Sequence, residues 1–202
     1  MLKGKKTFLR PLEPEDIKLY YKWYNDQTVN YWANGAWPLS TMLSEEVIEE
    51  RFFLPQKDCG RFIILNEEQK PIGTIGYRDV NIPARSAVLF IIIGEQEYWE
   101  KGYGTDALRV LAEYLFFQWN FNRLSLDLWD GNIRAQKAYE KIGFKVEGRL
   151  RQARYVLGEY RDAIIMGLLR EEYKKIGYVG YKIAKVIDIT MFLPVTRGVT
   201  KV

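Results

Sequence analysis

Two glycines, one residue apart, precede an apolar helical pattern in the stretch YWEKGYGTDALRVL (98–111). Gly102 and Gly104 allow a tight turn and leave no side chain over the first amides of the helix. Those amides lack partners within the helix, and the helix dipole adds partial positive charge there. With Lys101 at the rim, this pattern predicts an anion site suited to a pyrophosphate. A glycine-rich turn with a purely structural role is the alternative.

The segment before this turn, SAVLFIIIG (86–94), is a continuous apolar run typical of a strand covered on both faces. It places the anion site at the carboxyl end of a central strand, where ligands of α/β proteins bind. Ala107 replaces the third glycine of a dinucleotide fingerprint, and no Gly-Lys-Ser/Thr follows. The sequence therefore indicates neither a Rossmann motif nor a P-loop.

The remaining segments alternate between strand and helix patterns, which predicts one mixed α/β domain. Apolar periodicity and turn residues indicate helices at 14–25, 42–53, 105–116 and 132–143. They indicate strands at 6–12, 61–67, 70–80, 86–94 and 123–129, followed by two long closing strands after residue 144.

Composition narrows the function classes. The chain has 202 residues, of which 48% are hydrophobic, a single cysteine and no histidine. The missing histidines remove the commonest general base and the commonest metal ligand, and we expect no metal. No apolar run approaches the roughly 20 residues of a membrane span, and no signal peptide pattern opens the chain. We therefore expect a cytoplasmic protein without disulfides.

The net charge of +4 is unevenly distributed along the chain. Residues 174–202 hold six basic residues and one acidic residue, whereas residues 1–173 hold 24 basic and 25 acidic residues. The domain itself therefore lacks the basic stripe of a nucleic-acid-binding protein, and we expect no nucleic acid partner. We predict a domain at 1–173 and a basic, apolar extension at 174–202 that packs against protein, either on its own domain or in a homodimer.

The motifs GYGTDAL, N-x-R-A-x-x-x-Y-x-K-x-G-F, EGRLR and YRDAIIMGLL together resemble the GNAT superfamily of acetyl-CoA-dependent N-acetyltransferases. The N-terminal FLRPLEPED and the WYND…VNYW stretch resemble its branch of RimJ/RimL ribosomal-protein and spermidine acetyltransferases. The resemblance covers residues 6 to 173. It implies a mostly antiparallel sheet of about seven strands flanked by helices, whose fourth and fifth strands splay apart to admit acetyl-CoA.

The resemblance also implies which residues bind acetyl-CoA. Backbone amides of the glycine-rich turn would hold the pyrophosphate, and the edge of the central strand would pair with the pantetheine arm. Trp99 stands where the family most often has Gln or Arg. The implied cofactor-binding residues are Ile91, Ile92, Ile93, Lys101, Gly102, Tyr103, Gly104, Thr105, Asn132, Ala135 and Tyr139.

Two of these positions have a specific implied role. Asn132 would hydrogen-bond the cofactor arm, and Tyr139 would face the sulfur. A phenol at hydrogen-bond distance can protonate the departing thiolate when an amine attacks the thioester. Asn132 is equally suited to capping a helix, and Tyr139 to being a half-buried aromatic residue.

The general base is harder to assign in a chain without histidine. Glu95, just past the central strand, is the first candidate, and Asp79 and Asp26 are weaker ones. A partly desolvated carboxylate there would have a raised pKa and could accept the proton of a primary amine. A solvated loop residue is the alternative for Glu95.

The acceptor pocket is expected between the first two helices, with Trp23, Tyr31, Trp32 and Tyr77 as substrate residues. Such aromatics suit a cationic or amphipathic guest, although they are equally suited to an ordinary core. Four glutamates at 45, 46, 49 and 50 could attract a polyamine or a basic N-terminus. The acceptor remains open among a ribosomal N-terminus, a polyamine, an amino sugar and an antibiotic. A non-catalytic acyl-CoA-binding domain is the alternative to an enzyme.

Overall fold

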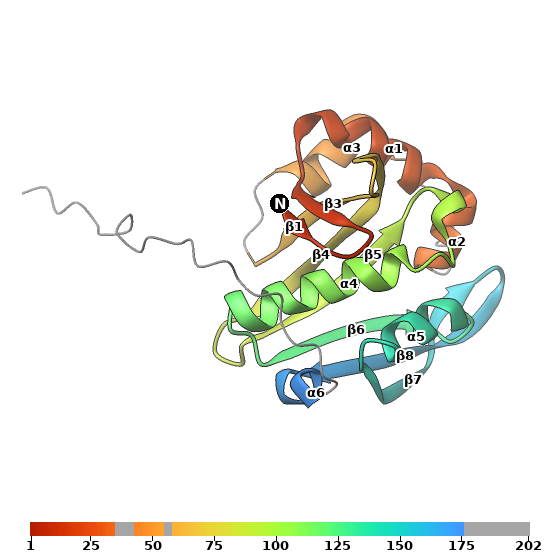
Figure 1. Cartoon of the computed structure of the whole chain (residues 1–202). Helices are drawn as coiled ribbons and strands as arrows, with labels where there is room; N and C mark the ends of the chain where they lie inside the picture. Colours follow the sequence, from red (N-terminus) through yellow and green to blue (C-terminus); the bar gives the residue numbers. More distant parts are fainter. Residues whose placement is uncertain (35–42, 55–57, 176–202) are drawn as a thin grey trace, which may run out of the picture.

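The computed structural model describes residues 1–34, 43–54 and 58–175, and it contains an eight-stranded sheet (Figure 1). The strand order is β1-β2-β3-β4-β5-β6-β8-β7. The strands are β1 (Leu2–Lys3), β2 (Phe8–Pro11), β3 (Gly60–Leu65), β4 (Pro71–Asn81), β5 (Ser86–Ile93), β6 (Arg123–Trp129), β7 (Lys145–Val156) and β8 (Glu159–Leu169). The short β1 is the strand that the sequence patterns did not predict, and the mostly antiparallel α/β architecture is confirmed.

The sheet opens between β5 and β6, which form its one parallel pair. They pair only at Ser86–Val88 with Arg123–Ser125, although both strands continue beyond these residues. The other neighbouring strands pair antiparallel. This is the predicted separation of the fourth and fifth strands, with the count shifted by one because of β1.

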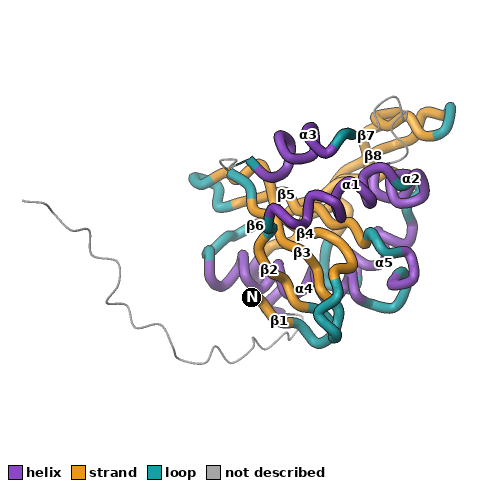
Figure 2. Tube along the Cα trace, turned by 90° about the horizontal axis from the view of Figure 1, so that it is seen from above, coloured by secondary structure: helices purple, strands orange, loops and turns teal. Residues whose placement is uncertain are grey.

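Helices cover both faces of the sheet, as the two views at right angles show (Figures 1 and 2). On one face, α4 packs over a core that includes Ile64 and Leu108. On the other face, α1 packs over Ile63. The helices are α1 (Ile17–Asn25), α2 (Gln27–Asn34), α3 (Glu45–Ile48), α4 (Tyr103–Glu113), α5 (Ile133–Glu140) and α6 (Arg170–Lys175).

Three predicted helices are more irregular than expected. The segment Pro14–Asp16 is a 3₁₀ turn that leads into α1, and Glu49–Phe53 is a π-helical turn that follows α3. Residue 42, the predicted start of the second helix, lies outside the described residues. The predicted helix after Gly104 likewise ends in a π-helical turn, Tyr114–Gln118.

The expectation that the central strand is buried on both faces is wrong. Ala87 and Leu89, on one face, are buried, whereas Ser86 and Val88, on the other face, and residues 90–93 are half-buried. For residues 90–93 the reason is that the β6 ladder ends at Val88, so the carboxyl half of β5 borders the opening.

The C-terminal part of the described chain is anchored by Tyr173, which is fully buried and lies against Phe116 and Phe117. Helix α6 spans the predicted domain boundary after residue 173. The predicted extension lies outside the described residues from 176 onward, so its packing stays a prediction. No helix in the described ranges is long and apolar enough to cross a membrane.

Candidate active site

A cavity of about 550 Å³ lies where β5 and β6 separate, between α4, α5 and the end of α2. Its lining includes nine of the eleven predicted cofactor-binding residues; Lys101 and Tyr103 are the exceptions. We call it the first cavity. Its lining residues are Val29, Trp32, Ala33, Ile91, Ile92, Ile93, Tyr98, Trp99, Glu100, Gly102, Gly104, Thr105, Leu108, Asp127, Leu128, Asn132, Ile133, Arg134, Ala135, Lys137, Ala138, Tyr139 and Lys141.

The N-terminus of α4 faces the first cavity through its two glycines. Gly102 is the N-cap, its φ of 87° lies in the left-handed region, and no side chain caps the helix. A Cβ on Gly104 would lie 3.7 Å from Ile93 and 3.8 Å from Ile91, which is ordinary contact. The first-turn Asp106 instead accepts hydrogen bonds from the backbone of Lys6 and Thr7. The exposed amides and the helix dipole favour an anion at this end.

The side chain of Tyr103 is directed away from the first cavity. Its hydroxyl donates to Glu67 at 2.9 Å, and its ring lies edge-on to Tyr98. The carbonyl of Lys101 accepts a hydrogen bond from Lys6 Nζ at 3.0 Å. Any contribution of Tyr103 to cofactor binding is therefore limited to its backbone.

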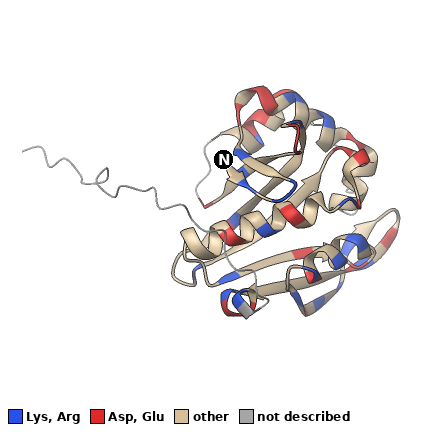
Figure 3. Ribbon diagram, viewed as in Figure 1, with Lys and Arg blue, Asp and Glu red and all other residues tan. Residues whose placement is uncertain are grey.

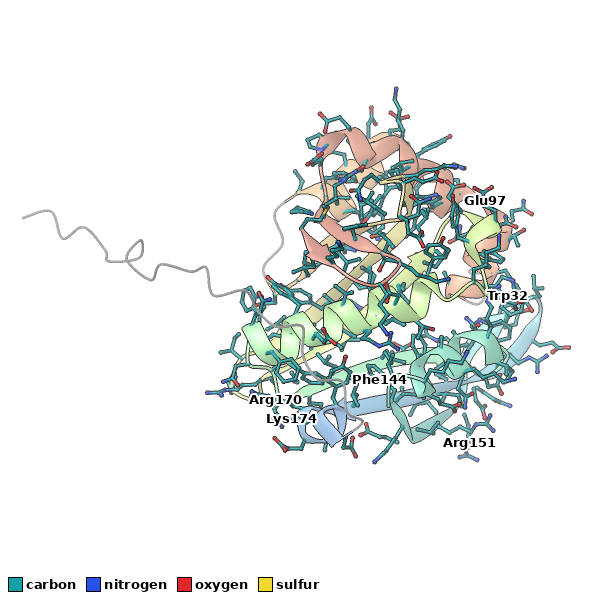
Figure 4. All side chains as sticks on the ribbon, viewed as in Figure 1. Trp32, Glu97, Phe144, Arg151, Arg170 and Lys174 are labelled. Carbon is teal, nitrogen blue, oxygen red and sulfur yellow. The ribbon has the colours of Figure 1, made fainter. Side chains whose placement is uncertain are left out.

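Asn132 closes the cavity by joining α5 to α2. Its Oδ1 accepts from the backbone N–H of Ala135 at 3.1 Å, which confirms its helix-capping role. Its Nδ2 donates to the carbonyl of Trp32 at 2.6 Å, and Trp32 lies beside α5 in Figure 4. Both polar groups of Asn132 thus already have protein partners.

Sequence reasoning missed a basic residue on α5, Arg134, which lines the same cavity. Figure 3 shows α5 with several basic positions in blue. The Arg134 guanidinium lies 4.2 Å from the ring centroid of Trp99 and 5.0 Å from that of Trp32. Burial lowers the pKa of Arg134 from its ordinary value, although a guanidinium stays charged. The sequence did contain a signal for this basic face. Basic residues recur at intervals of three and four residues, at Arg134, Lys137 and Lys141, and this spacing places them on one helix face.

A second cavity, of about 500 Å³, shares Ala33, Ile91, Ile92, Asp127, Leu128 and Tyr139 with the first. We call it the second cavity. Its other lining residues are Tyr24, Asn30, Leu43, Arg51, Phe52, Arg61, Arg78, Leu89, Phe90, Trp129 and Arg154. The shared residues lie on α2, β5, β6 and α5, so the two cavities meet where β5 and β6 part.

Tyr139 lies at this junction. Its side chain is 8% exposed, and its hydroxyl makes no hydrogen bond to any residue that the structure describes. Burial raises the pKa of the phenol well above its ordinary value of 10, and the charge of Asp127 raises it further. Tyr139 is therefore neutral at physiological pH and keeps a proton to donate.

The expectation of a raised pKa at Glu95 is wrong. Burial does raise the pKa of this carboxyl, but hydrogen bonds from Lys22 and Trp23 outweigh it, and the net pKa is lowered. Lys22 Nζ lies 2.7 and 2.8 Å from the two carboxylate oxygens, and Trp23 Nε1 donates at 3.0 Å. Glu95 lines neither cavity and fastens α1 to the end of β5.

The two weaker candidates for the base also lie outside both linings. Asp26 accepts from the backbone N–H of Val29 at 2.9 Å, where it caps the first turn of α2. Asp79 forms an ion pair with its neighbour Arg78.

Of the four predicted substrate residues, Trp32 alone lines either of these two cavities. It lines the first cavity and not the second. Trp23, 1% exposed, and Tyr77, 8% exposed, belong to the core. The ring of Tyr31 packs edge-on to Trp32 and tilted against Trp129. Trp23 and Tyr77 therefore fit the core alternative. The amphipathic helix α1 buries Trp23 against the sheet, and Tyr77 packs into the core from strand β4.

Sequence reasoning also missed the four arginines that line the second cavity: Arg51, Arg61, Arg78 and Arg154. They belong to four separate elements, so no local spacing connects them. The glutamates at 45, 46, 49 and 50, predicted to attract a cationic acceptor, are exposed and line neither cavity.

Comparisons with known proteins agree with this geometry. The acetyltransferase (GNAT) domain family matches residues 6–145. Spermidine N(1)-acetyltransferase of Escherichia coli (strain K12) is 31% identical over 166 residues, covering 82% of this chain and 87% of the relative. An uncharacterized N-acetyltransferase, YokL, from the SPbeta prophage of Bacillus subtilis (strain 168) is 25% identical over 171 residues. The match covers 85% of this chain and 94% of the relative.

A solved structure extends the likeness to three dimensions. The crystal structure of spermidine N-acetyltransferase from Vibrio cholerae in complex with CoA and spermine superposes with a TM-score of 0.75. It is 26% identical and covers 83% of this chain and 98% of that chain. Together with the family match and the opened sheet, these relatives show that the chain belongs to the GNAT family of acetyl-CoA-dependent N-acetyltransferases.

Proposed function

We propose that the chain transfers the acetyl group of acetyl-CoA to a primary amine, with the two substrates entering from opposite cavities and reacting beside Tyr139. The observation that carries this proposal is that Tyr139 lines both cavities where β5 and β6 separate. Acetyl-CoA would occupy the first cavity and the amine the second.

The first cavity offers a partner for each part of acetyl-CoA. The amides at the α4 N-terminus, from Gly102 to Thr105, would bind the pyrophosphate. Arg134 and Lys137 would neutralise its remaining phosphate charge. The half-buried end of β5 has backbone groups beyond its β6 ladder, and these would pair with the pantetheine amides.

The reaction itself is a direct transfer in a ternary complex. The amine nitrogen attacks the thioester carbonyl carbon, and the carbon–sulfur bond breaks as the thiolate leaves. The nitrogen is cationic after the attack and releases one proton to water, while the Tyr139 hydroxyl donates its proton to the departing sulfur. Burial keeps the phenol protonated until this step. The Tyr139 phenolate then takes up a proton from water.

The amine would bind in its uncharged form, without a dedicated general base. Among the described residues, Asp127 and Glu100 are the carboxylates that line the cavities. Asp127 is already engaged by Arg78 and Arg154. The rate should therefore rise with pH towards the pKa of the amine, about 8 for an α-amine and about 10.4 for a lysine-like amine.

Several finer assignments complete the proposal. Sequence motifs support a place in the RimJ/RimL-like branch, and the absence of a spanning helix in the described part of the chain supports a cytoplasmic enzyme. The domain at 1–173, the packed extension at 174–202 and a homodimer remain predictions. The relatives named as spermidine acetyltransferases bring polyamines into the range of acceptors to be tested.

The test is thiol release from acetyl-CoA, measured with the full chain against a panel of primary amines and matched alcohols. Thiol release that depends on an amine, with no reaction of the alcohols, is the expected result. Binding of acetyl-CoA without any amine-dependent thiol release would instead identify a non-catalytic acyl-CoA-binding domain.

A further inference from the structure

The second cavity carries a pronounced excess of positive charge. Four arginines and a single carboxylate, Asp127, are the charged residues of its described lining. A lining with this balance of charges favours an anionic guest over a polycation, because opposite charges attract and like charges repel.

Arg61 on β3 gives this charge a fixed position. Its guanidinium lies 4.9 Å from the ring centroid of Phe52 and 5.0 Å from that of Phe90, and both rings line the cavity. No carboxylate of the described residues lies within 4 Å of it, and its enclosed Nε has no acceptor in that part of the chain. The aromatic contacts hold the guanidinium in place while its charge stays uncompensated by an acid.

Arg78 and Arg154 share one counter-ion. Arg78 Nη2 lies 3.6 Å from Asp127, and Arg154 forms a direct ion pair with the same carboxylate. The two arginines are 47% and 35% exposed, so their remaining N–H groups are accessible to a ligand. Asp127 therefore orients two arginines beside the proposed reaction point. Together with Asp79, which also pairs with Arg78, it balances their charge, so the charge without a nearby acid is that of Arg61.

The surroundings supply negative charge to Arg78 but not to Arg61. Asp79 pairs with Arg78 from outside the lining. The exposed glutamates at 45, 46, 49 and 50 also lie outside the lining, and none of them forms an ion pair with Arg61 among the described residues.

We propose that the acceptor is a primary amine that also carries an oxyanion group, a carboxylate or a phosphate, bound by Arg61, Arg78 and Arg154. Guanidinium groups bind such oxyanions through paired N–H donors, whereas a polyamine offers them no acceptor. This inference deepens the proposed function and rests on it, because it assigns the second cavity to the amine.

The experiment compares kcat/KM for matched amines that differ in their anionic group. The pairs are ethanolamine and O-phosphoethanolamine, and β-alaninamide and β-alanine, with putrescine and spermidine as polycations. We expect the anionic member of at least one pair to exceed its neutral partner by about tenfold or more, in keeping with one charge-assisted hydrogen bond. The phosphate pair and the carboxylate pair separate the two sources of the oxyanion.

Variants make the assignment residue-specific. Arg61→Gln should raise KM for the anionic amine about tenfold and leave KM for acetyl-CoA unchanged, thereby reducing the discrimination within the pair. Arg161→Gln, an exposed arginine outside both linings, is the matched control and should leave the preference intact.

The outcomes distinguish this inference from the proposed function. Two results would each overturn the inference and leave the transferase function standing. One is faster transfer to spermidine or putrescine than to every anionic amine. The other is an Arg61→Gln variant that still prefers the anionic member of a pair as strongly as wild type does. A wild-type chain that acetylates none of these amines or the wider panel, although it binds acetyl-CoA, would remove both.

Discussion

The two cavities that meet at Tyr139 are built in different ways. The first cavity uses backbone amides, glycines and the N-terminal turns of two helices, and most of its residues fall within two short motifs. The second cavity uses arginine side chains from four separate elements, held by aromatic rings and one shared carboxylate. Under the proposed assignment, acetyl-CoA is recognised by local backbone geometry, and the acceptor by side chains that only the tertiary fold brings together.

The largest effect is expected at the backbone of the first cavity. Gly104→Val should weaken acetyl-CoA binding by about 100-fold or more, to an undetectable level. The reason is that a branched side chain would occupy the space before the first amides of α4. The fold should survive, since a Cβ there makes only ordinary contact with Ile91 and Ile93. Calorimetry measures the affinity, and Gly148→Val, at an open position on β7, is the control. Undiminished affinity would refute the phosphate-binding assignment.

At the junction, Tyr139→Phe should lower kcat about 100-fold while acetyl-CoA affinity stays nearly the same.

The raised pKa of Tyr139 also predicts the shape of the wild-type pH profile. Because the phenol stays protonated beyond its ordinary pKa of 10, wild-type kcat/KM should show no alkaline decline up to about pH 10. Initial rates from pH 6 to 10 test this. A Phe variant with the wild-type rate would assign proton donation to another group.

A smaller effect is expected from the basic rim of the first cavity. Arg134→Gln should weaken acetyl-CoA binding about tenfold at low salt, because one charge-assisted contact to phosphate is lost. Its kcat at saturating acetyl-CoA should not change, and the difference from wild type should shrink as ionic strength rises. Arg151→Gln, which lies outside both linings and points outward in Figure 4, should have no effect on affinity. A fall in kcat without a change in affinity would contradict the role of Arg134.

The smallest effect is expected at Glu95, outside both cavities. Glu95→Gln should change kcat/KM less than about twofold at any pH, but it should cost about 1 kcal/mol of unfolding free energy at pH 7. Because folding lowers the pKa of Glu95, its carboxylate stabilises the fold fully at pH values above the unfolded-state pKa of about 4.3. This stabilisation is lost as the pH falls through the folded-state pKa. Denaturant unfolding at pH 7 and pH 3 should therefore show a difference from wild type that shrinks in acid. A rate defect confined to low pH would restore Glu95 as the base.

These expectations also explain what the sequence could predict. Gly102 and Gly104 lie in one short segment, so their spacing indicated the helix N-terminus that faces the first cavity, and the family resemblance added Asn132. The apolar run before them likewise indicated the strand that borders the opening, although not that its last residues are half-buried. That depended on where β6 stops pairing, which is a property of the whole sheet.

The errors had a common physical cause. Trp23 and Tyr77 were assigned to the substrate because aromatic side chains suit both a cationic guest and a core, and sequence does not say which face of α1 or β4 they occupy. Glu95 was given a raised pKa because its position past β5 was visible, whereas the approach of Lys22, 73 residues away in sequence, was not. Arg61 and Arg154 were missed for the same reason, since only the fold brings them to one cavity.

The most direct test of the two-cavity account is a crystal structure of the chain with CoA bound. The account predicts the pyrophosphate at the α4 N-terminus and the thiol sulfur within about 3.5 Å of the Tyr139 hydroxyl, on the path to the cavity lined by Arg61. A sulfur atom directed away from Tyr139, or CoA bound outside the opening between β5 and β6, would contradict it.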